Sequence, residues 1–301
     1  MLLGKLIKNI KPAYKSIRFN NIRFNSKDCK TNDVFFSIQG NKLNGNSYIK
    51  DAIRNGSKII ISNLNFEGFN KEKILFINRK NPRKALAEAA SNFYTKKPKN
   101  IIAVTGTNGK TSIANFFYQI LSLSKKKAAA IGTLGILSKE IKLKTNNTTI
   151  DPLKIHYTLQ QLKNLKIDNV IIEASSHGLK QHRLDGINLK TALFTNLSRD
   201  HLDYHKTFKD YLNSKLILFD KLLLDKGNII FESGISQEKK LKKISKKKKL
   251  KIHNIGSENS FINLKKIQKI NDKKRINFSL LKKDYSFNSY LIGSIQIKNL
   301  L

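Results

Sequence analysis

A run of four apolar residues, Ile101–Val104, leads directly into a short loop with two glycines and then into a helical pattern that opens at Lys110. A continuous β-favouring run indicates a strand buried on both faces. Apolar residues that recur every three or four positions over Ile113–Leu121 indicate an amphipathic helix. This succession of strand, loop and helix constrains the fold most, because it is typical of α/β proteins with a parallel sheet.

The loop itself, residues 105–111 and hereafter the phosphate loop, has the composition of a phosphate cradle. Glycines let backbone N–H groups converge on phosphate oxygens, and the N-terminus of the following helix favours negative charge. The usual motif has a glycine where this chain has Val104, so the flanking strand and helix carry the prediction over the alternative of a structural turn. We expect ATP to be bound by Gly106, Thr107, Asn108, Gly109, Lys110, Thr111 and Ser112, with the Thr111 hydroxyl on Mg²⁺.

Further along the chain, strand-like and helical segments alternate, which predicts a mainly parallel sheet with right-handed crossovers. The expected strands are 128–131, 169–173, 192–195 and 228–231, and the expected helices are 152–163 and 208–224. Before residue 98, short apolar runs and a helical period at 84–94 suggest a smaller unit, and the polar stretch around Pro98 suggests the boundary. We therefore predict an α/β fold with an N-terminal domain at 1–97 and a P-loop ATPase-like domain at 98–301.

The net charge of +37 raises the possibility of a nucleic-acid partner. However, only 8 of the 58 basic residues are arginine, and Lys, Asn and Ile are enriched together. These residues have A/T-rich codons, whereas phosphate and base readers favour the bidentate arginine fork. We expect no nucleic-acid partner and interpret the lysine run at 239–251 as a solvated surface helix. A basic, nucleic-acid-dependent P-loop NTPase remains the alternative.

No apolar run approaches the roughly 20 residues that a membrane-spanning helix needs. The first 17 residues lack the continuous apolar segment of a signal peptide. The single cysteine, Cys29, excludes an internal disulfide framework. These features predict a cytoplasmic protein with no membrane partner.

Acidic and histidine side chains gather where neighbouring strands are expected to end. Glu173 ends one strand, and the segment after the next strand contains Asp200, His201 and His205. In open parallel sheets, ligands bind beyond the carboxyl ends of the strands. The i, i+4 spacing of His201 and His205 admits zinc, but no cysteine or third ligand is evident, so we prefer Mg²⁺.

At this point the sequence resembles the Mur ligases, and within them the branch that adds the third residue to UDP-MurNAc-L-Ala-D-Glu. The resemblance spans nearly the whole chain and is densest in five segments: 104–111, 147–149, 173–179, 181–183 and 195–205. The Ser175-Ser176-His177-Gly178-Leu179 string and the string around His201 are specific to this branch. Folylpolyglutamate synthases are similar at the phosphate loop but not through these segments.

The resemblance implies an ATP-dependent ligase of peptidoglycan precursor synthesis, acting in cell shape and division, that joins a diamino acid, meso-diaminopimelate or L-lysine, through an acyl phosphate. It implies catalytic roles for Lys110, Glu173, His201 and Lys215, metal contacts at Thr111, Glu173, His201 and Lys215, and a carbamate on Lys215 that holds a second Mg²⁺. It places the UDP-sugar dipeptide on Phe24, Ser26, Asn41, Lys42, Leu43, Asn147, Thr148, Thr149, Ser175, Gln181 and Arg183.

The resemblance also implies a further domain that reads the amino acid, whose Asp-Asn-Pro-Arg motif does not occur in this sequence. We therefore expect a monomeric fragment with an incomplete central domain, unable to close a catalytic site alone. Full single-turnover activity of residues 1–301 would contradict this expectation. An inactive fragment that binds ATP or the UDP-sugar is the alternative.

Overall fold

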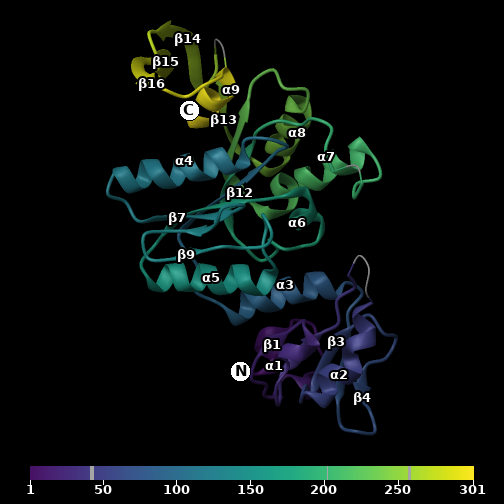
Figure 1. Ribbon diagram of the computed structural model, residues 1–301. Coiled ribbons are helices and arrows are strands. Elements are labelled where there is room, and N and C mark those ends of the chain that lie inside the picture. The colour runs from purple at the N-terminus through teal and green to yellow at the C-terminus, as the bar shows by residue number, and fades with distance from the viewer. Residues whose placement is uncertain (41–43, 202, 257–258) are drawn as a thin grey trace. The chain divides into compact units, whose positions relative to one another are not determined.

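The computed structural model describes residues 1–301 except 41–43, 202 and 257–258. The chain forms two compact α/β units (Figure 1). The first comprises Met1–Lys96, Asp151–Gln160 and Gln181–Gly186, and the second comprises Lys97–Ile150, Gln161–Lys180 and Ile187–Leu301. Helix α5 (Pro152–Asn164) begins in a segment of the first unit and ends in the second.

The first unit has a small sheet in the order β1-β2-β3-β5-β4, parallel except for the β4–β5 pair. Its strands are β1 (Ile22–Arg23), β2 (Val34–Phe36), β3 (Ile59–Ser62), β4 (Gly68–Phe69) and β5 (Leu75–Asn78). Its helices are α1 (Leu3–Leu6), α2 (Ile49–Arg54) and α3 (Pro82–Phe93), with 3₁₀ turns at Pro12–Tyr14, Ser26–Asp28 and Gly45–Tyr48. Apolar side chains of β2 and β3 are buried on both faces of this sheet, which explains their unbroken apolar runs.

The second unit has a larger sheet in the order β16-β15-β14-β13-β12-β11-β6-β10-β7-β8-β9. From β14 to β7 neighbouring strands are parallel, and both ends of the sheet are antiparallel. The strands are β6 (Asn100–Thr105), β7 (Ala128–Gly132), β8 (Gly135–Leu137), β9 (Lys142–Leu143), β10 (Asn169–Glu173), β11 (Leu189–Phe194), β12 (Leu223–Glu232), β13 (Lys251–Gly256), β14 (Ile262–Ile270), β15 (Lys273–Leu280) and β16 (Lys283–Ser289).

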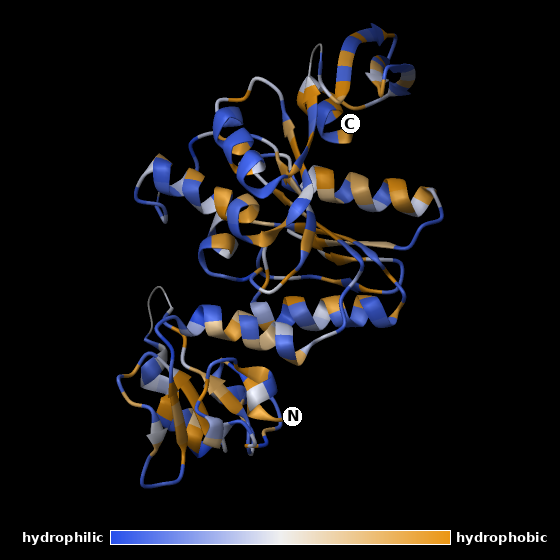
Figure 2. Cartoon of the chain, turned by 180° about the vertical axis from the view of Figure 1, so that it is seen from behind, coloured by the Kyte–Doolittle hydropathy of each residue, from blue (hydrophilic) through white to orange (hydrophobic). Residues whose placement is uncertain are grey.

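Helices connect these strands, as the alternating sequence pattern predicts. They are α4 (Lys110–Leu123), α5, α6 (Ser176–Lys180), α7 (Phe208–Ile217) and α8 (Glu238–Lys248), and α9 (Ser294–Leu300) follows the last strand. Helix α4 packs over β6, β7 and β10, where Ala114 meets Val104, Ala130 and Ile171 in a buried cluster. The strands at the centre of each sheet are coloured as hydrophobic in Figure 2, in agreement with this burial.

The α/β prediction with a mainly parallel sheet is confirmed, while some boundaries differ. The helix expected at 208–224 is α7 followed by a π-helical turn at Leu218–Leu222, and Leu224 already belongs to β12. The lysine-rich helix is α8, but Lys251 starts β13, because Lys249 has a left-handed backbone that ends the helix. The weak strand signal after Lys251 corresponds to a continuous antiparallel sheet, β14 to β16.

Candidate functional site

The phosphate loop follows β6, which lies between β11 and β10 and is parallel to both. Gly106 has φ +150°, and a Cβ there would lie 1.8 Å from Thr195 Oγ1. Gly109 has φ +88° at the N-cap of α4, and a Cβ there would lie 2.9 Å from the Asn299 side chain. Both positions therefore need glycine, for the left-handed backbone and for the close approach.

Two lysine side chains converge on one carbonyl of the loop. Lys110 Nζ donates to Gly106 O at 2.9 Å and to Thr107 O at 2.8 Å, and Lys215 Nζ donates to Gly106 O at 2.7 Å. Burial lowers the pKa of Lys110 below its usual value, while Glu173 and Asp200 act in the opposite direction. The convergence places two amino groups at the side of the loop where a polyphosphate would lie.

Lys215 belongs to α7 and is 1% exposed. Its ammonium group lies 4.3 Å from the centre of the Tyr211 ring, which adds a cation–π contact. Burial, and then the charge of Lys110, lower the pKa of Lys215 to about 7. A large fraction of Lys215 is therefore a neutral amine at neutral pH.

Glu173 lies at the end of β10 and is 1% exposed. One of its oxygens, Oε2, accepts hydrogen bonds from the hydroxyls of Thr111, at 2.8 Å, and of Thr133, at 3.2 Å. The other, Oε1, accepts from the Thr133 N–H at 2.9 Å. These bonds fix the orientation of a buried carboxylate beside the first turn of α4.

The Thr111 hydroxyl and the Glu173 carboxylate are oxygen donors of the kind that Mg²⁺ binds. Across the part of the chain that the structure describes, no group of three His, Cys, Asp or Glu side chains could hold a metal ion. Mg²⁺ needs no such group, because it keeps several waters and takes further oxygens from phosphates. The pair therefore fits Mg²⁺ bound with a nucleotide, and a zinc site at His201 and His205 is not supported among the described residues.

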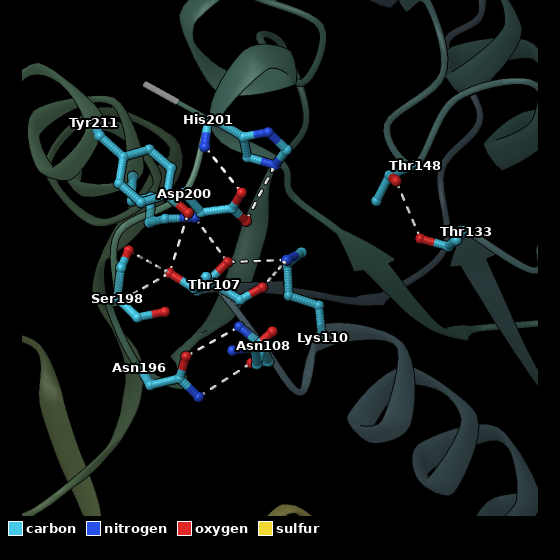
Figure 3. Close-up of polar contacts among 12 residues, drawn as sticks. Thr107, Asn108, Lys110, Thr133, Thr148, Asn196, Ser198, Asp200, His201 and Tyr211 are labelled. Atoms are coloured by element: carbon cyan, nitrogen blue, oxygen red, sulfur yellow. Dashed lines mark hydrogen bonds and ion pairs between the residues drawn. The ribbon is translucent and has the colours of Figure 1, made fainter. Parts of the chain in front are cut away.

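On the β11 side, the segment after the strand holds the backbone of the loop (Figure 3). The Asn196 side chain accepts from the Asn108 N–H at 3.0 Å and donates to the Asn108 carbonyl at 3.3 Å, and Thr195 Oγ1 donates to the same carbonyl at 2.6 Å. Thr107 Oγ1 accepts from the Ser198 N–H at 3.0 Å and lies 3.1 Å from the Tyr211 hydroxyl.

Sequence reasoning did not assign a role to Thr133, Thr195, Asn196, Ser198 or Tyr211. Four of them lie within, or a few residues beyond, the motif string at 195–205, which was the signal available. Thr133 follows the glycine at the end of β7, where strand ends meet the loop, and that position alone marks it.

His201 lies on the β11 side of the loop, beside Asp200 and Tyr211 (Figure 3). Its Nε2 is 3.5 Å from Asp200 Oδ2, and its backbone has φ +52°. His205 is fully buried, and its Nδ1 is 3.3 Å from Asp210 Oδ2. Burial lowers the pKa of His205, against the opposing effect of Asp210. The backbone N–H of His205 also donates to His201 O at 2.9 Å.

The predicted residues for the UDP-sugar dipeptide divide between the two units. In the second unit, Thr149 Oγ1 bonds Glu173 O at 2.8 Å and Ser175 Oγ at 3.0 Å, so the 147–149 loop lies against the end of β10. Thr148 Oγ1 lies 3.0 Å from Thr133 Oγ1. Asn147 belongs to the same loop, where its carbonyl accepts from Thr145.

In the first unit, Phe24 and Ser26 line a cavity of about 690 Å³ with Asn25, Lys27, Phe35, Ile38, Gly40, Gly45, Tyr48, Asp51, Arg54 and Asn55. Arg183 donates to Gln181 Oε1 from Nε at 3.2 Å and from Nη2 at 2.8 Å. The predicted positions Asn41, Lys42 and Leu43 lie outside the described residues.

A second cavity, of about 220 Å³, lies beside the phosphate loop between α4, the ends of β11 and β12, and α9. Its walls are mainly apolar and include Phe116, Phe117, Ile230 and Phe231. The ion pair between Lys298 and Glu232, at 2.5 Å, lies at this cavity. An apolar cavity beside the predicted phosphate loop has the character of a pocket for a planar, mainly apolar group.

Comparison with known proteins identifies relatives of this chain. The family model described as the Mur ligase middle domain matches residues 104–301, and the model described as the Mur ligase family, catalytic domain, matches residues 18–94. The UDP-N-acetylmuramoyl-L-alanyl-D-glutamate--2,6-diaminopimelate ligase of Rickettsia montanensis is 38% identical over 297 residues, which cover 97% of this chain and 61% of that protein. The protein of the same name from Clostridium tetani is 40% identical over 249 residues, 82% of this chain and 51% of that one.

Solved structures show the same fold. A structure of a UDP-N-acetylmuramoyl-L-alanyl-D-glutamate--2,6-diaminopimelate ligase matches all of this chain and 62% of its own with a TM-score of 0.85 at 23% identity. A MurF ligase from Thermotoga maritima, in complex with ADP, matches 93% of this chain and 60% of its own with a TM-score of 0.62 at 18% identity. The chain spans about three fifths of the length of the first of these curated relatives. On the match of the middle-domain model over residues 104–301, the chain belongs to the Mur ligase family.

Proposed function

We propose that this chain is the substrate- and ATP-binding part of a ligase that joins 2,6-diaminopimelate to UDP-MurNAc-L-Ala-D-Glu in peptidoglycan precursor synthesis, the route that sustains cell shape and division. The observation that carries the proposal is the convergence of Lys110 and Lys215 on Gly106 O, next to the Thr111–Glu173 pair. The names of relatives at 38% and 40% identity favour diaminopimelate over L-lysine.

The reaction brings anions together. The D-Glu carboxylate attacks the γ-phosphorus of ATP, ADP leaves, and an acyl phosphate forms. The amine of the diamino acid then attacks the acyl carbon, and the tetrahedral intermediate loses inorganic phosphate and a proton to leave an amide. Fixed cations lower the barrier, because they stabilise the charge that develops as the two anions approach.

The phosphate loop supplies backbone N–H groups and the Lys110 ammonium for the phosphates. Thr111 and Glu173 would hold Mg²⁺, which neutralises phosphate charge and orients the γ-phosphoryl group. His201 is assigned to the same metal region by its place in the 195–205 motif. The Asn196 and Thr195 bonds would hold the backbone of the loop at Asn108.

Lys215 is proposed to act as a carbamate. Its pKa of about 7 leaves a neutral amine that can add to CO₂, with loss of one proton. The product, an N-carboxylate, would replace a buried amine by an anion able to hold a second Mg²⁺. Lys215 Nζ already lies within 2.7 Å of the phosphate loop.

The UDP-sugar dipeptide is proposed to bind Phe24, Ser26, Asn41, Lys42, Leu43, Asn147, Thr148, Thr149, Ser175, Gln181 and Arg183. The division of labour would be an N-terminal UDP-substrate domain at 1–97 and a central ATP-binding domain at 98–301. In the described residues no helix is long and apolar enough to cross a membrane. We propose a cytoplasmic monomer whose partners are small molecules and not nucleic acid.

The test is a ligase assay with the protein that carries this chain, ATP, Mg²⁺, UDP-MurNAc-L-Ala-D-Glu and 2,6-diaminopimelate. We expect one ADP and one phosphate for each amide formed, and much slower amide formation with L-lysine. ATP hydrolysis that depends on DNA or RNA, without amide formation, would instead support a nucleic-acid-dependent NTPase. If the chain binds neither ATP nor the UDP-sugar dipeptide, the proposal is refuted.

A further inference from the structure

We propose that Thr133 is a positioning residue that couples the sugar–dipeptide site to the metal–nucleotide site, through its contacts with Thr148 and Glu173. The inference rests on the proposed function, because it takes Thr148 as a substrate contact and Glu173 as a metal ligand. It adds a residue to which neither the sequence motifs nor the family resemblance gave a role.

Thr133 touches Glu173 twice. Its N–H donates to Oε1 at 2.9 Å, and its hydroxyl lies 3.2 Å from Oε2. The same hydroxyl lies 3.0 Å from the hydroxyl of Thr148. A dashed line marks this contact in Figure 3. One small side chain therefore stands between the carboxylate at the end of β10 and the loop that precedes α5.

The direction of these bonds follows from the chemistry of the groups. An ionised carboxylate only accepts hydrogen bonds, so the Thr133 hydroxyl donates to Glu173. Its single proton is then used, and Thr148 must donate to Thr133. The result is a directed series of hydrogen bonds, from Thr148 to Thr133 and from Thr133 to Glu173. Glu173 also accepts a hydrogen bond from Thr111.

The surrounding backbone holds these hydrogen-bonded side chains in place. Gly132 approaches Glu173 so closely that a Cβ would lie 2.0 Å from Oε1. Thr145 Oγ1 lies 3.3 Å from both Gly132 O and Asn147 O, and its single proton is shared between them or donated to one of them, so the 145–148 loop lies against the turn that carries Thr133. A shift of either segment therefore moves the Thr133 hydroxyl relative to the carboxylate.

Substrate binding would change this series of hydrogen bonds at Thr148. If a substrate oxygen accepts a hydrogen bond from the Thr148 hydroxyl, the hydrogen bond from Thr148 to Thr133 is lost. The Thr133 hydroxyl then bonds only Glu173. The position of Glu173 then depends on whether the sugar–dipeptide site is filled. Thermodynamic linkage requires the reverse effect to be equally large, so the UDP-sugar and the Mg²⁺-nucleotide change one another's affinity by the same factor.

The experiment measures this factor by calorimetry on the 301-residue chain. Mg²⁺ with a non-hydrolysable ATP analogue is titrated with and without saturating UDP-MurNAc-L-Ala-D-Glu. For the native chain we expect the affinity to change by a factor of about 5, within the usual range of coupling between sites. Thr133→Val keeps the shape but removes the hydroxyl, and we expect the factor to fall to about 1.

Thr133→Ser restores the hydroxyl and serves as the matched control, with a factor close to that of the native chain. A purely structural role predicts instead that Thr133→Val lowers the melting temperature and leaves the factor unchanged. A factor of 1 in the native chain, or an unchanged factor in Thr133→Val, overturns the inference while the proposed function stands. If the native chain binds neither ligand, the proposed function fails first. Thr133→Ala replaces Thr133→Val should the latter not fold.

Discussion

The two strand ends beside the phosphate loop have different chemistry. The β10 flank, formed by Glu173 and Thr133, presents a buried carboxylate to the first turn of α4. The β11 flank, formed by Thr195, Asn196 and Ser198, presents neutral amide and hydroxyl groups to the loop backbone. Strands β10 and β11 both pair in parallel with β6, and Thr133 follows β7, the next strand beyond β10, so the difference between the flanks comes from side chains and not from strand direction.

The difference separates two tasks. On the proposed function, neutral groups shape a loop that receives the phosphates, since a carboxylate bonded to the loop backbone would repel them. A carboxylate displaced to the other flank can instead hold the cation that accompanies the phosphates. The two lysines complete the arrangement, and Lys215 belongs to α7, which follows the β11 flank in the chain.

The largest expected effect concerns Lys215 and pH. Its pKa is about 7 in the folded chain, below its ordinary value of 10.5, so between these pH values the unfolded chain binds a proton that the folded chain lacks. Stability contributed by this residue therefore rises with pH across that window. Relative to Lys215→Met, the native chain should gain on the order of 4 kcal/mol between pH 7 and 10.

Urea unfolding at pH 7, 8.5 and 10, in buffers free of CO₂, measures this gain. Lys126→Met, at an exposed position after α4, is the control and should follow the native chain at every pH. Parallel curves for the native chain and Lys215→Met would mean that Lys215 keeps its proton throughout, and the carbamate proposal would then lose its physical basis.

The second effect tests the β10 flank. Glu173→Gln keeps the volume of the side chain but removes its charge. The factor by which Mg²⁺ increases the affinity for ATP should be at least ten times smaller in this variant than in the native chain, a difference of about 1.4 kcal/mol or more. Binding of metal-free ATP should change little. Titration of ATP with and without Mg²⁺ separates the two quantities.

Glu88→Gln, on the surface of the first unit, is the control. An equal loss with and without Mg²⁺ would show that Glu173 shapes the loop and does not hold the metal.

The smallest effect tests the β11 flank. Asn196→Ala removes bonds to both backbone groups of Asn108, and we expect about 1 kcal/mol, or roughly fivefold, weaker ATP binding. Because this flank is neutral, the loss should be the same with and without Mg²⁺. Asn65→Ala, at an exposed position in the first unit, is the control. A loss confined to the Mg²⁺ complex would remove the distinction between the flanks.

Much of this arrangement follows from local sequence patterns. The apolar run before the glycine loop and the periodic helix after it predict β6, the phosphate loop and α4, and the structure places them there. Glu173 was selected because a carboxylate ends an apolar strand, and the parallel register brings that strand end level with the loop. The roles assigned to these residues remain predictions.

Contacts between distant segments could not be predicted in the same way. The Thr133–Glu173 bonds join residues 40 positions apart, and the Asn196–Asn108 bonds join residues 88 apart, so no periodicity encodes them. The burial of Lys215 among other groups is likewise a tertiary property, since one lysine among fifty carries no local signal. The β14–β16 sheet was underestimated because its lysine-rich strands alternate irregularly.

The most direct test of the account is the affinity of Mg²⁺-ATP for the native chain and for Lys110→Ala, measured by calorimetry. Lys110 already bonds the loop carbonyls and lies where phosphates would approach, so its removal should weaken binding about 100-fold or more, since bonds to charged groups contribute roughly 1.5–3 kcal/mol each. Lys126→Ala should bind as the native chain does. Equal affinities of the native chain and Lys110→Ala would contradict the assignment of residues 105–111 as the phosphate loop of a Mur ligase.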